Sequence, residues 1–147
     1  GALGFEVTRW DMAETAHGGP FPEILDHEIF VNAILARPGV PVFLPKTAVD
    51  ALRRLTVIAD VACDPESDYN PVPVYDRATS FDAPVIRVAA GPLPLDVMAI
   101  DNLPSMLPAE SSRDFAAQLL PSLAALDRIG EGVWARAKAE FDRHMGT

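Results

Sequence analysis

The sequence predicts an α/β protein in which a doubly wound parallel sheet is followed by two C-terminal helices. Three observations support this fold class. Short apolar runs that suit buried parallel strands recur between residues 28 and 100. A segment typical of a helix separates two of these runs, as the crossover of a parallel sheet requires. Two stretches with helical spacing of apolar residues occupy residues 111–143.

The first part of the chain supplies the sheet. Its expected elements are, in order, strands at 5–11 and 28–35, a helix at 45–55, and strands at 55–61, 84–89 and 95–100. The stretch 5–11 alternates apolar and polar residues, whereas 28–35 is almost wholly apolar, as in a strand covered on both faces. Pro45 stands near the first turn of the helix, where proline is tolerated. Residues 63–81 are expected to form a long irregular loop, which is usually functional or disordered.

The last part of the chain supplies two helices separated by Gly130. Ser111 with Asp114 resembles a capping box at the start of the first helix. Pro121 is expected to kink or split that helix. One face of the second helix carries apolar side chains that we expect to pack in a core, namely Val133, Trp134, Ala137 and Phe141.

Composition narrows the possible functions. The chain has 147 residues and a formal net charge of −9, which argues against binding to nucleic acid or to an anionic membrane. Its single cysteine, Cys63, permits no intrachain disulfide and fits a reducing compartment. No apolar run approaches the roughly 20 residues of a membrane span. We therefore expect a cytoplasmic location and, because there is no initiator methionine, a piece of a longer protein.

The titratable residues do not predict a metal site. The histidines lack ligand spacing, and the acidic group Asp64, Glu66 and Asp68 lacks the glycine and terminal glutamate of a calcium loop. Cys63 has no histidine signature nearby and is interpreted as a buried thiol rather than a nucleophile.

Short signatures along the chain occur in an order that is more specific than any one of them. They are Arg9-Trp10-Asp11, Glu14-Thr15 with Gly18-Gly19-Pro20-Phe21, Phe30-Val31-Asn32-Ala33-Ile34, Val57-Ile58-Ala59-Asp60-Val61, Asn70-Pro71-Val72-Pro73-Val74-Tyr75, Ile100-Asp101-Asn102-Leu103-Pro104-Ser105-Met106-Leu107-Pro108, Leu119-Leu120-Pro121-Ser122-Leu123 and Val133-Trp134-Ala135-Arg136-Ala137-Lys138. Together they resemble the C-terminal portion of the NAD-dependent, L-lysine-forming saccharopine dehydrogenases. The Asp-Asn-Leu-Pro turn is also similar to one in alanine dehydrogenases and transhydrogenases.

The resemblance implies an enzyme with two Rossmann-like domains and an active site in the cleft between them. Such an enzyme cleaves saccharopine to L-lysine and 2-oxoglutarate while reducing NAD. Residues 1–104 are then the distal part of the NAD domain, without its first strand–helix unit, and residues 105–147 pack back toward a missing N-terminal catalytic domain. The acid–base lysine and histidine are expected in that missing domain. No catalytic residue is therefore expected in this chain, and the chain alone should be inactive.

The resemblance also implies the NAD contacts Asp11, Thr15, Leu35, Val61, Asp101, Asn102 and Leu103. Asp11 would accept hydrogen bonds from the ribose hydroxyls and disfavour a 2′-phosphate, and Leu35 would give an apolar contact where a related enzyme has tyrosine. Asp101 would bind the carboxamide or ribose, or neutralise charge near the substrate amine. Each has a plainer alternative. Asp11 suits a solvated loop, Thr15 a helix cap, Leu35 a strand end, Val61 a core and Asp101 a helix cap. A side-chain role for Asn102 is doubtful, since some relatives have histidine there.

Two other functions stay open. One is a related amino-acid dehydrogenase of the alanine dehydrogenase type, and the other is a non-catalytic binding or assembly module. The glycine-rich phosphate loop of such folds is missing, and Gly1-Ala2-Leu3-Gly4 is either its remnant or the end of a preceding helix. A sheet that lacks its first unit should have an exposed edge or face, which predicts self-association or marginal stability.

Overall fold

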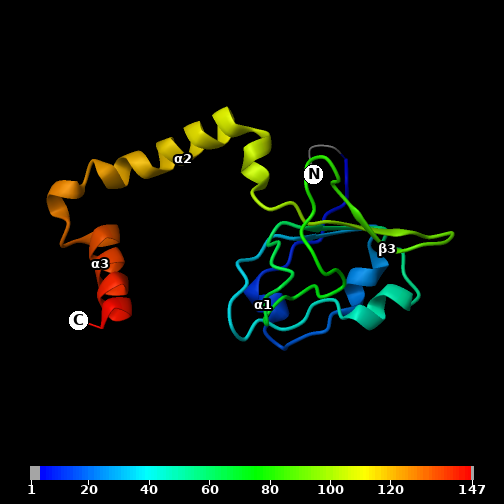
Figure 1. Cartoon of the computed structure of the whole chain (residues 1–147). Coiled ribbons are helices and arrows are strands. Elements are labelled where there is room, and N and C mark those ends of the chain that lie inside the picture. The colour runs from blue at the N-terminus through cyan, green and yellow to red at the C-terminus, as the bar shows by residue number, and fades with distance from the viewer. Residues whose placement is uncertain (1–3, 147) are drawn as a thin grey trace. The chain divides into compact units, whose positions relative to one another are not determined.

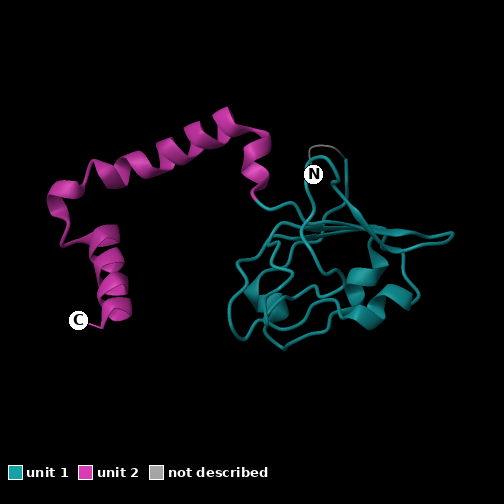
Figure 2. Ribbon diagram, in the orientation of Figure 1, with its two compact units in different colours: residues 1–101 teal, residues 102–147 magenta. Residues whose placement is uncertain are grey.

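The computed structural model describes residues 4–146 and divides the chain into two compact units, Gly1–Asp101 and Asn102–Thr147 (Figure 2). Gly1, Ala2 and Leu3, which the sequence relates to a phosphate loop or a helix end, lie outside the described residues. The first unit contains the sheet and the second contains two long helices (Figure 1).

The first unit is built on a four-stranded sheet with the order β1-β2-β4-β3. Its strands are β1 (Ile29–Asn32), β2 (Val57–Asp60), β3 (Ile86–Ala89) and β4 (Leu95–Met98). The pairs β1–β2 and β2–β4 are parallel, which confirms the α/β class with a mostly parallel sheet. Strand β3 is antiparallel to β4, so the expectation of a wholly parallel sheet is wrong there. The short connection at 90–94 explains this, because only antiparallel neighbours can be joined by a hairpin.

Among residues 4–101, helical structure is limited to three short pieces. These are α1 (Met12–Thr15) and the 3-10 helices η1 (Pro22–Asp26) and η2 (Lys46–Asp50). The helix expected at 45–55 is therefore reduced to η2. After it, the backbone N–H of Arg54 donates to Leu25 O (2.7 Å) and that of Thr56 donates to Glu28 O (3.0 Å). These bonds place residues 54–56 beside the segment that leads into β1, so the chain does not continue as a helix after η2.

The strand expected at 5–11 is absent, since residues 5–10 form no strand and Asp11 caps α1. Trp10 packs edge-on against Phe21, with ring centroids 5.4 Å apart. The chain then turns at Asp11, where a capping box with Glu14 begins the helix. Trp10 thus contacts the core through its ring, while residues 5–10 do not form a strand.

One face of the sheet is buried and the opposite face is open. Ile58 and Val97 lie side by side on the buried face and are fully enclosed. Figure 1 shows the short helices on one side of the sheet. The open face carries Ile29, Val31, Val57, Ala59 and Met98. Ile29 and Val31 are each more than half exposed, so β1 is not covered on both faces as expected.

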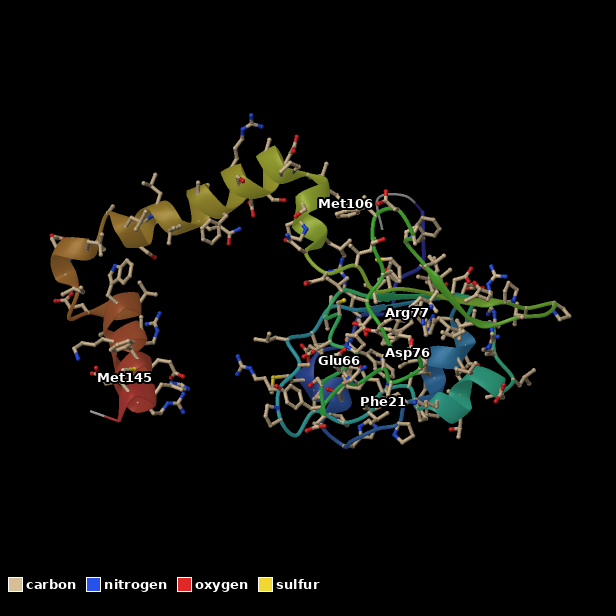
Figure 3. The ribbon with its side chains drawn as sticks, viewed as in Figure 1. Phe21, Glu66, Asp76, Arg77, Met106 and Met145 are labelled. Atoms are coloured by element: carbon tan, nitrogen blue, oxygen red, sulfur yellow. The ribbon has the colours of Figure 1, made fainter. Side chains whose placement is uncertain are left out.

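The segment before β1 is fastened to the core by backbone contacts. Phe21, labelled in Figure 3, is almost fully buried and packs against Phe43. Its N–H donates to Phe43 O (3.0 Å), and the Phe43 N–H donates to Pro71 O (2.7 Å). Gly19 lies so close to this segment that a Cβ atom there would be 1.9 Å from the carbonyl oxygen of Val42. Only glycine fits at this position.

Arg53 connects three backbone segments where β2 begins. Its guanidinium donates to Val49 O (3.2 Å), Leu93 O (2.8 Å), Pro94 O (3.5 Å) and Leu55 O. The side chain thereby ties the end of η2 to the start of β2 and to the β3–β4 hairpin.

Replacing Arg53 with alanine should lower the free energy of unfolding by about 2 kcal/mol, because several carbonyls lose a charged donor. Arg54→Ala is the matched control: its ion pair with Glu28 is exposed and should contribute under about 0.5 kcal/mol. Urea denaturation of both variants measures the difference. Equal losses would show that the Arg53 bonds do not hold the hairpin.

The second unit consists of η3 (Leu103–Met106), α2 (Pro108–Leu123), η4 (Leu126–Arg128) and α3 (Gly132–Met145). The capping box at Ser111 is wrong, because α2 begins earlier, with Leu107 as its N-cap, and the Ser111 hydroxyl donates to Pro104 O (3.1 Å). Helix α2 continues through Pro121 and ends two residues later, so the proline does not split it. The separation of the helices at Gly130 is confirmed.

The apolar face of α3 is not packed in a core. Val133 and Phe141 are exposed, contrary to the expectation. Trp134 is half-buried, and its indole N–H donates to Ser122 O (2.8 Å), which joins α3 to the end of α2. Within this unit the two helices meet at that point and offer no second layer for the rest of the face.

Candidate functional site

Three parallel strands end at the same edge of the sheet. Leu35 follows β1, Val61 follows β2, and Asp101 follows β4. Because β1, β2 and β4 are parallel and adjacent, their carboxyl ends share one edge. Open α/β sheets bind ligands at this edge. The structure therefore brings these three predicted residues to the part of the sheet where a site is expected.

A buried polar cluster lies directly under this edge. Asn32 and Asp60 are opposite each other at the ends of β1 and β2, and each is only 1% exposed. The Asn32 amide donates to Asp60 Oδ1 (2.9 Å), and the Tyr75 hydroxyl donates to Asp60 Oδ2 (2.9 Å). Buried polar groups need such partners, because leaving one unpaired is costly. We call Asn32, Asp60 and Tyr75 the strand-end cluster.

The hydrogen bonds of the strand-end cluster indicate which of its groups carry a proton. Burial, with the neighbouring Asp60 carboxylate, raises the pKa of the Tyr75 phenol well above its ordinary value. The phenol thus keeps its proton and donates it. The two Asp60 oxygens receive only donors, from the Asn32 amide, the Tyr75 hydroxyl and the backbone of Cys63. An ionised carboxylate satisfies all three at once.

The loop at 61–63 is held from three sides. The N–H groups of Val61 and Ala62 donate to Asn32 O (2.8 and 3.4 Å). The Cys63 N–H donates to Asp60 Oδ1 (3.2 Å), and the Cys63 thiol donates to Ala99 O (3.0 Å). Cys63 has a positive φ of 42°, a conformation that costs energy for a residue with a side chain. The surrounding bonds therefore impose the shape of this loop.

Charge at the edge is negative. Burial, followed by the carboxylates of Asp101, Asp60 and Asp64, raises the pKa of the Cys63 thiol. The thiol is consequently protonated at neutral pH, which agrees with its role as a hydrogen-bond donor to the backbone. Asp101 itself is exposed. An exposed carboxylate beside a strand end suits a ligand that offers amide or hydroxyl donors.

Asp11 is the N-cap of α1 and Thr15 is its last residue, and both side chains bond to nearby backbone. Asp11 Oδ1 accepts from the Ala13 N–H (2.7 Å), and the Asp11 N–H donates to Glu14 Oε2 (2.8 Å). The Thr15 hydroxyl donates to Asp11 O (3.0 Å). Asp11 is thus both exposed and the N-cap of a helix. The Thr15 hydroxyl bonds the backbone carbonyl four residues earlier, as threonine often does in a helix.

The remaining predicted residues begin the second unit. Asn102 has left-handed backbone angles, φ 59° and ψ 46°, and Leu103 starts η3. Asn102 is the N-cap of η3, without a side-chain capping bond, so the alternative that Asp101 caps this helix is wrong. Leu35 and Val61 are exposed, at 76% and 43%, so neither is core packing.

Sequence reasoning missed the strand-end cluster as a unit. Asn32, Asp60 and Tyr75 all stand within the quoted signatures, yet their bonds join residues 28 and 15 positions apart. The available signal was a polar side chain inside each of two apolar strands, which requires a buried partner.

Residues 4–146 contain no group of three His, Cys, Asp or Glu side chains that could hold a metal ion. Among the helices described, none has the length and apolar character needed to cross a bilayer.

A mostly parallel sheet with polar groups at its carboxyl edge places the first unit in the class of open α/β domains. Within this class, the chain is homologous to NAD-dependent, L-lysine-forming saccharopine dehydrogenases. It is 46% identical to the enzyme of Candida albicans over 142 residues, 48% identical to that of Neurospora crassa over 146 and 48% identical to that of Yarrowia lipolytica over 143.

These matches cover 95%, 96% and 95% of this chain but 37%, 39% and 38% of the respective relatives. The chain therefore spans less than two fifths of the length of these curated relatives, which is consistent with a C-terminal portion. No protein-family model matches the chain.

Proposed function

We propose that this chain is the cofactor-binding part of an NAD-dependent saccharopine dehydrogenase. In this reaction saccharopine, NAD and water give L-lysine, 2-oxoglutarate and NADH. The observation that supports the proposal most strongly is the identity of 42–48% over nearly the whole chain to several enzymes of that name. Residues 1–104 would form the distal part of the NAD domain, and residues 105–147 would return to the catalytic domain.

The carboxyl edge of the sheet fits one end of NAD. Asp101 offers an exposed carboxylate to donors such as a carboxamide or ribose hydroxyls, and Val61 and Leu35 offer exposed apolar surface after β2 and β1. Asn102 and Leu103 continue the Asp101 turn. Asp11 would bind the adenosine ribose and repel a 2′-phosphate, with Thr15 next to it. NAD supplies the hydride acceptor, while these residues bind and orient it.

Proton transfer is assigned to residues outside this chain. The imine that hydride removal creates must be hydrolysed, and this step needs an acid and a base close to the substrate nitrogen. In this proposal a lysine and a histidine of the catalytic domain provide them. This chain alone should then bind cofactor weakly and catalyse nothing.

The full-length protein should reduce NAD when saccharopine is added, as followed by NADH absorbance. Asp101→Asn should lower kcat/KM about tenfold or more, the loss expected when a charge-assisted hydrogen bond is removed. Asp50→Asn is the matched control, because Asp50 is an exposed carboxylate of η2, the helix that precedes β2. It should leave kcat/KM within about twofold.

The other results distinguish the alternatives. Turnover with alanine and NAD, but not with saccharopine, would favour an enzyme of the alanine dehydrogenase type. A full-length protein that neither reduces NAD nor binds it would contradict the enzyme proposal and favour a non-catalytic binding or assembly module.

A further inference from the structure

Asp60 receives hydrogen bonds from three different segments of the first unit. Asn32 comes from the end of β1, Cys63 from the loop after β2, and Tyr75 from the far side of the irregular stretch 63–81. One carboxylate therefore fixes the mutual position of a strand end and two loops. Because Asp60 is only 1% exposed, it is shielded from solvent and reaches no ligand itself.

Val61 shows what this arrangement does at the surface. It follows Asp60 directly and is exposed, while the Asp60 side chain next to it is enclosed. On the other side of Val61, the backbone of Cys63 is bound to Asp60 and its thiol to Ala99, two residues before Asp101. These part-buried bonds thus set the separation between Val61 and the turn that carries Asp101.

The strained backbone of Cys63 makes these bonds necessary. A non-glycine residue with a φ of 42° is held there only by its surroundings. The Asp60 carboxylate holds the N–H of that very residue. Without this acceptor, Cys63 would relax toward negative φ and carry the 61–63 loop with it.

We propose that Asp60 is a positioning residue for the cofactor edge, which acts through the 61–63 loop to hold Val61 in register with Asp101. The inference rests on the proposed function, since it assigns the loop to the NAD site. Tyr75 and Asn32 support Asp60 by filling its remaining acceptor sites. None of the three touches the cofactor.

The test compares two neighbouring aspartates in the full-length protein. Asp60→Asn keeps the shape of the side chain but makes one acceptor oxygen a donor, so the three charge-assisted bonds to the carboxylate become weaker neutral bonds in a rearranged set. Asp64→Asn is the matched control: Asp64 is exposed and acts on Cys63 through its charge alone. Both variants remove one negative charge near Cys63, but only Asp60→Asn changes the group that accepts from the Cys63 N–H.

Two measurements are made on each variant. The first is NADH affinity, followed by the fluorescence of the bound dinucleotide. The second is the rate at which iodoacetamide modifies Cys63, read by mass spectrometry of the peptide that contains it. Asp60→Asn should weaken NADH binding about tenfold, the equivalent of one charge-assisted hydrogen bond, and should speed alkylation of Cys63. Asp64→Asn should change NADH affinity less than about twofold.

Unchanged NADH affinity in Asp60→Asn, or equal changes in both variants, would overturn the positioning role while leaving the proposed function intact. A wild-type protein that binds no NADH would overturn both. If Asp60→Asn does not fold, amide hydrogen exchange of the wild type decides. A Cys63 N–H that is protected, and more so with NADH, supports the proposal, whereas free exchange of that amide contradicts it.

Discussion

Replacing Gly19 with alanine should destabilise the first unit by about 3 kcal/mol or more. The added Cβ would lie 1.9 Å from the Val42 carbonyl oxygen, far inside van der Waals contact, and the obstacle is backbone. Neither side can retreat easily, because Phe21 and Phe43 are joined by a backbone hydrogen bond and Phe43 is bound in turn to Pro71. Urea or thermal denaturation measures the loss.

Gly39→Ala serves as the control for this experiment. Gly39 has a φ of +92°, yet open space surrounds the position of its Cβ. The substitution should therefore cost only the conformational penalty, about 1 kcal/mol. Losses of the same size at both glycines would mean that the backbone at Val42 shifts enough to admit the added Cβ, so that close packing there does not require glycine at position 19.

Replacing Asp60 with alanine should lower the free energy of unfolding by about 3 kcal/mol. The variant leaves the Asn32 amide, the Tyr75 hydroxyl and the Cys63 N–H without their acceptor in a site that excludes water. Tyr75→Phe removes only one of these bonds together with its donor, so its loss should be about 1 kcal/mol. Chemical denaturation at neutral pH gives both values.

Asp64→Ala is the control for Asp60→Ala, because Asp64 is exposed. It should alter the free energy of unfolding by less than about 0.5 kcal/mol. If Tyr75→Phe destabilises as much as Asp60→Ala, the single bond from the Tyr75 hydroxyl would account for the whole loss, because this variant keeps the aromatic ring. The bonds from Asn32 and Cys63 to Asp60 would then contribute nothing measurable.

The parts of the fold that local sequence determines were predictable. Strands β2 and β4 are short apolar runs next to turn residues, and burial on one face is enough to specify them. The stretch 5–11 has an equally good alternating pattern, but a strand also needs a neighbour, and a pattern of side chains carries no information on that. The Asp11–Glu14 capping box was the signal for a helix start that this alternation obscured.

The candidate site was predictable only at its surface. The Asp101 turn was conspicuous because a carboxylate and an amide follow an apolar strand, and the resemblance drew attention to Val61 and Leu35. The buried layer beneath them depends on bonds between residues distant in sequence, such as Tyr75 with Asp60. Backbone conformation is equally hidden, since nothing local indicates that Cys63 takes a positive φ.

The open face of the sheet has a thermodynamic consequence. Ile29 and Val31 keep more than half of their surface in contact with water while the unit is folded. Unfolding normally increases heat capacity, because it exposes buried apolar side chains to water. Since Ile29 and Val31 are already hydrated in the folded unit, unfolding exposes less new apolar surface. Its heat capacity of unfolding should be small for its length. Any partner that covers this face should reveal itself by a negative heat-capacity change on binding, whatever its affinity.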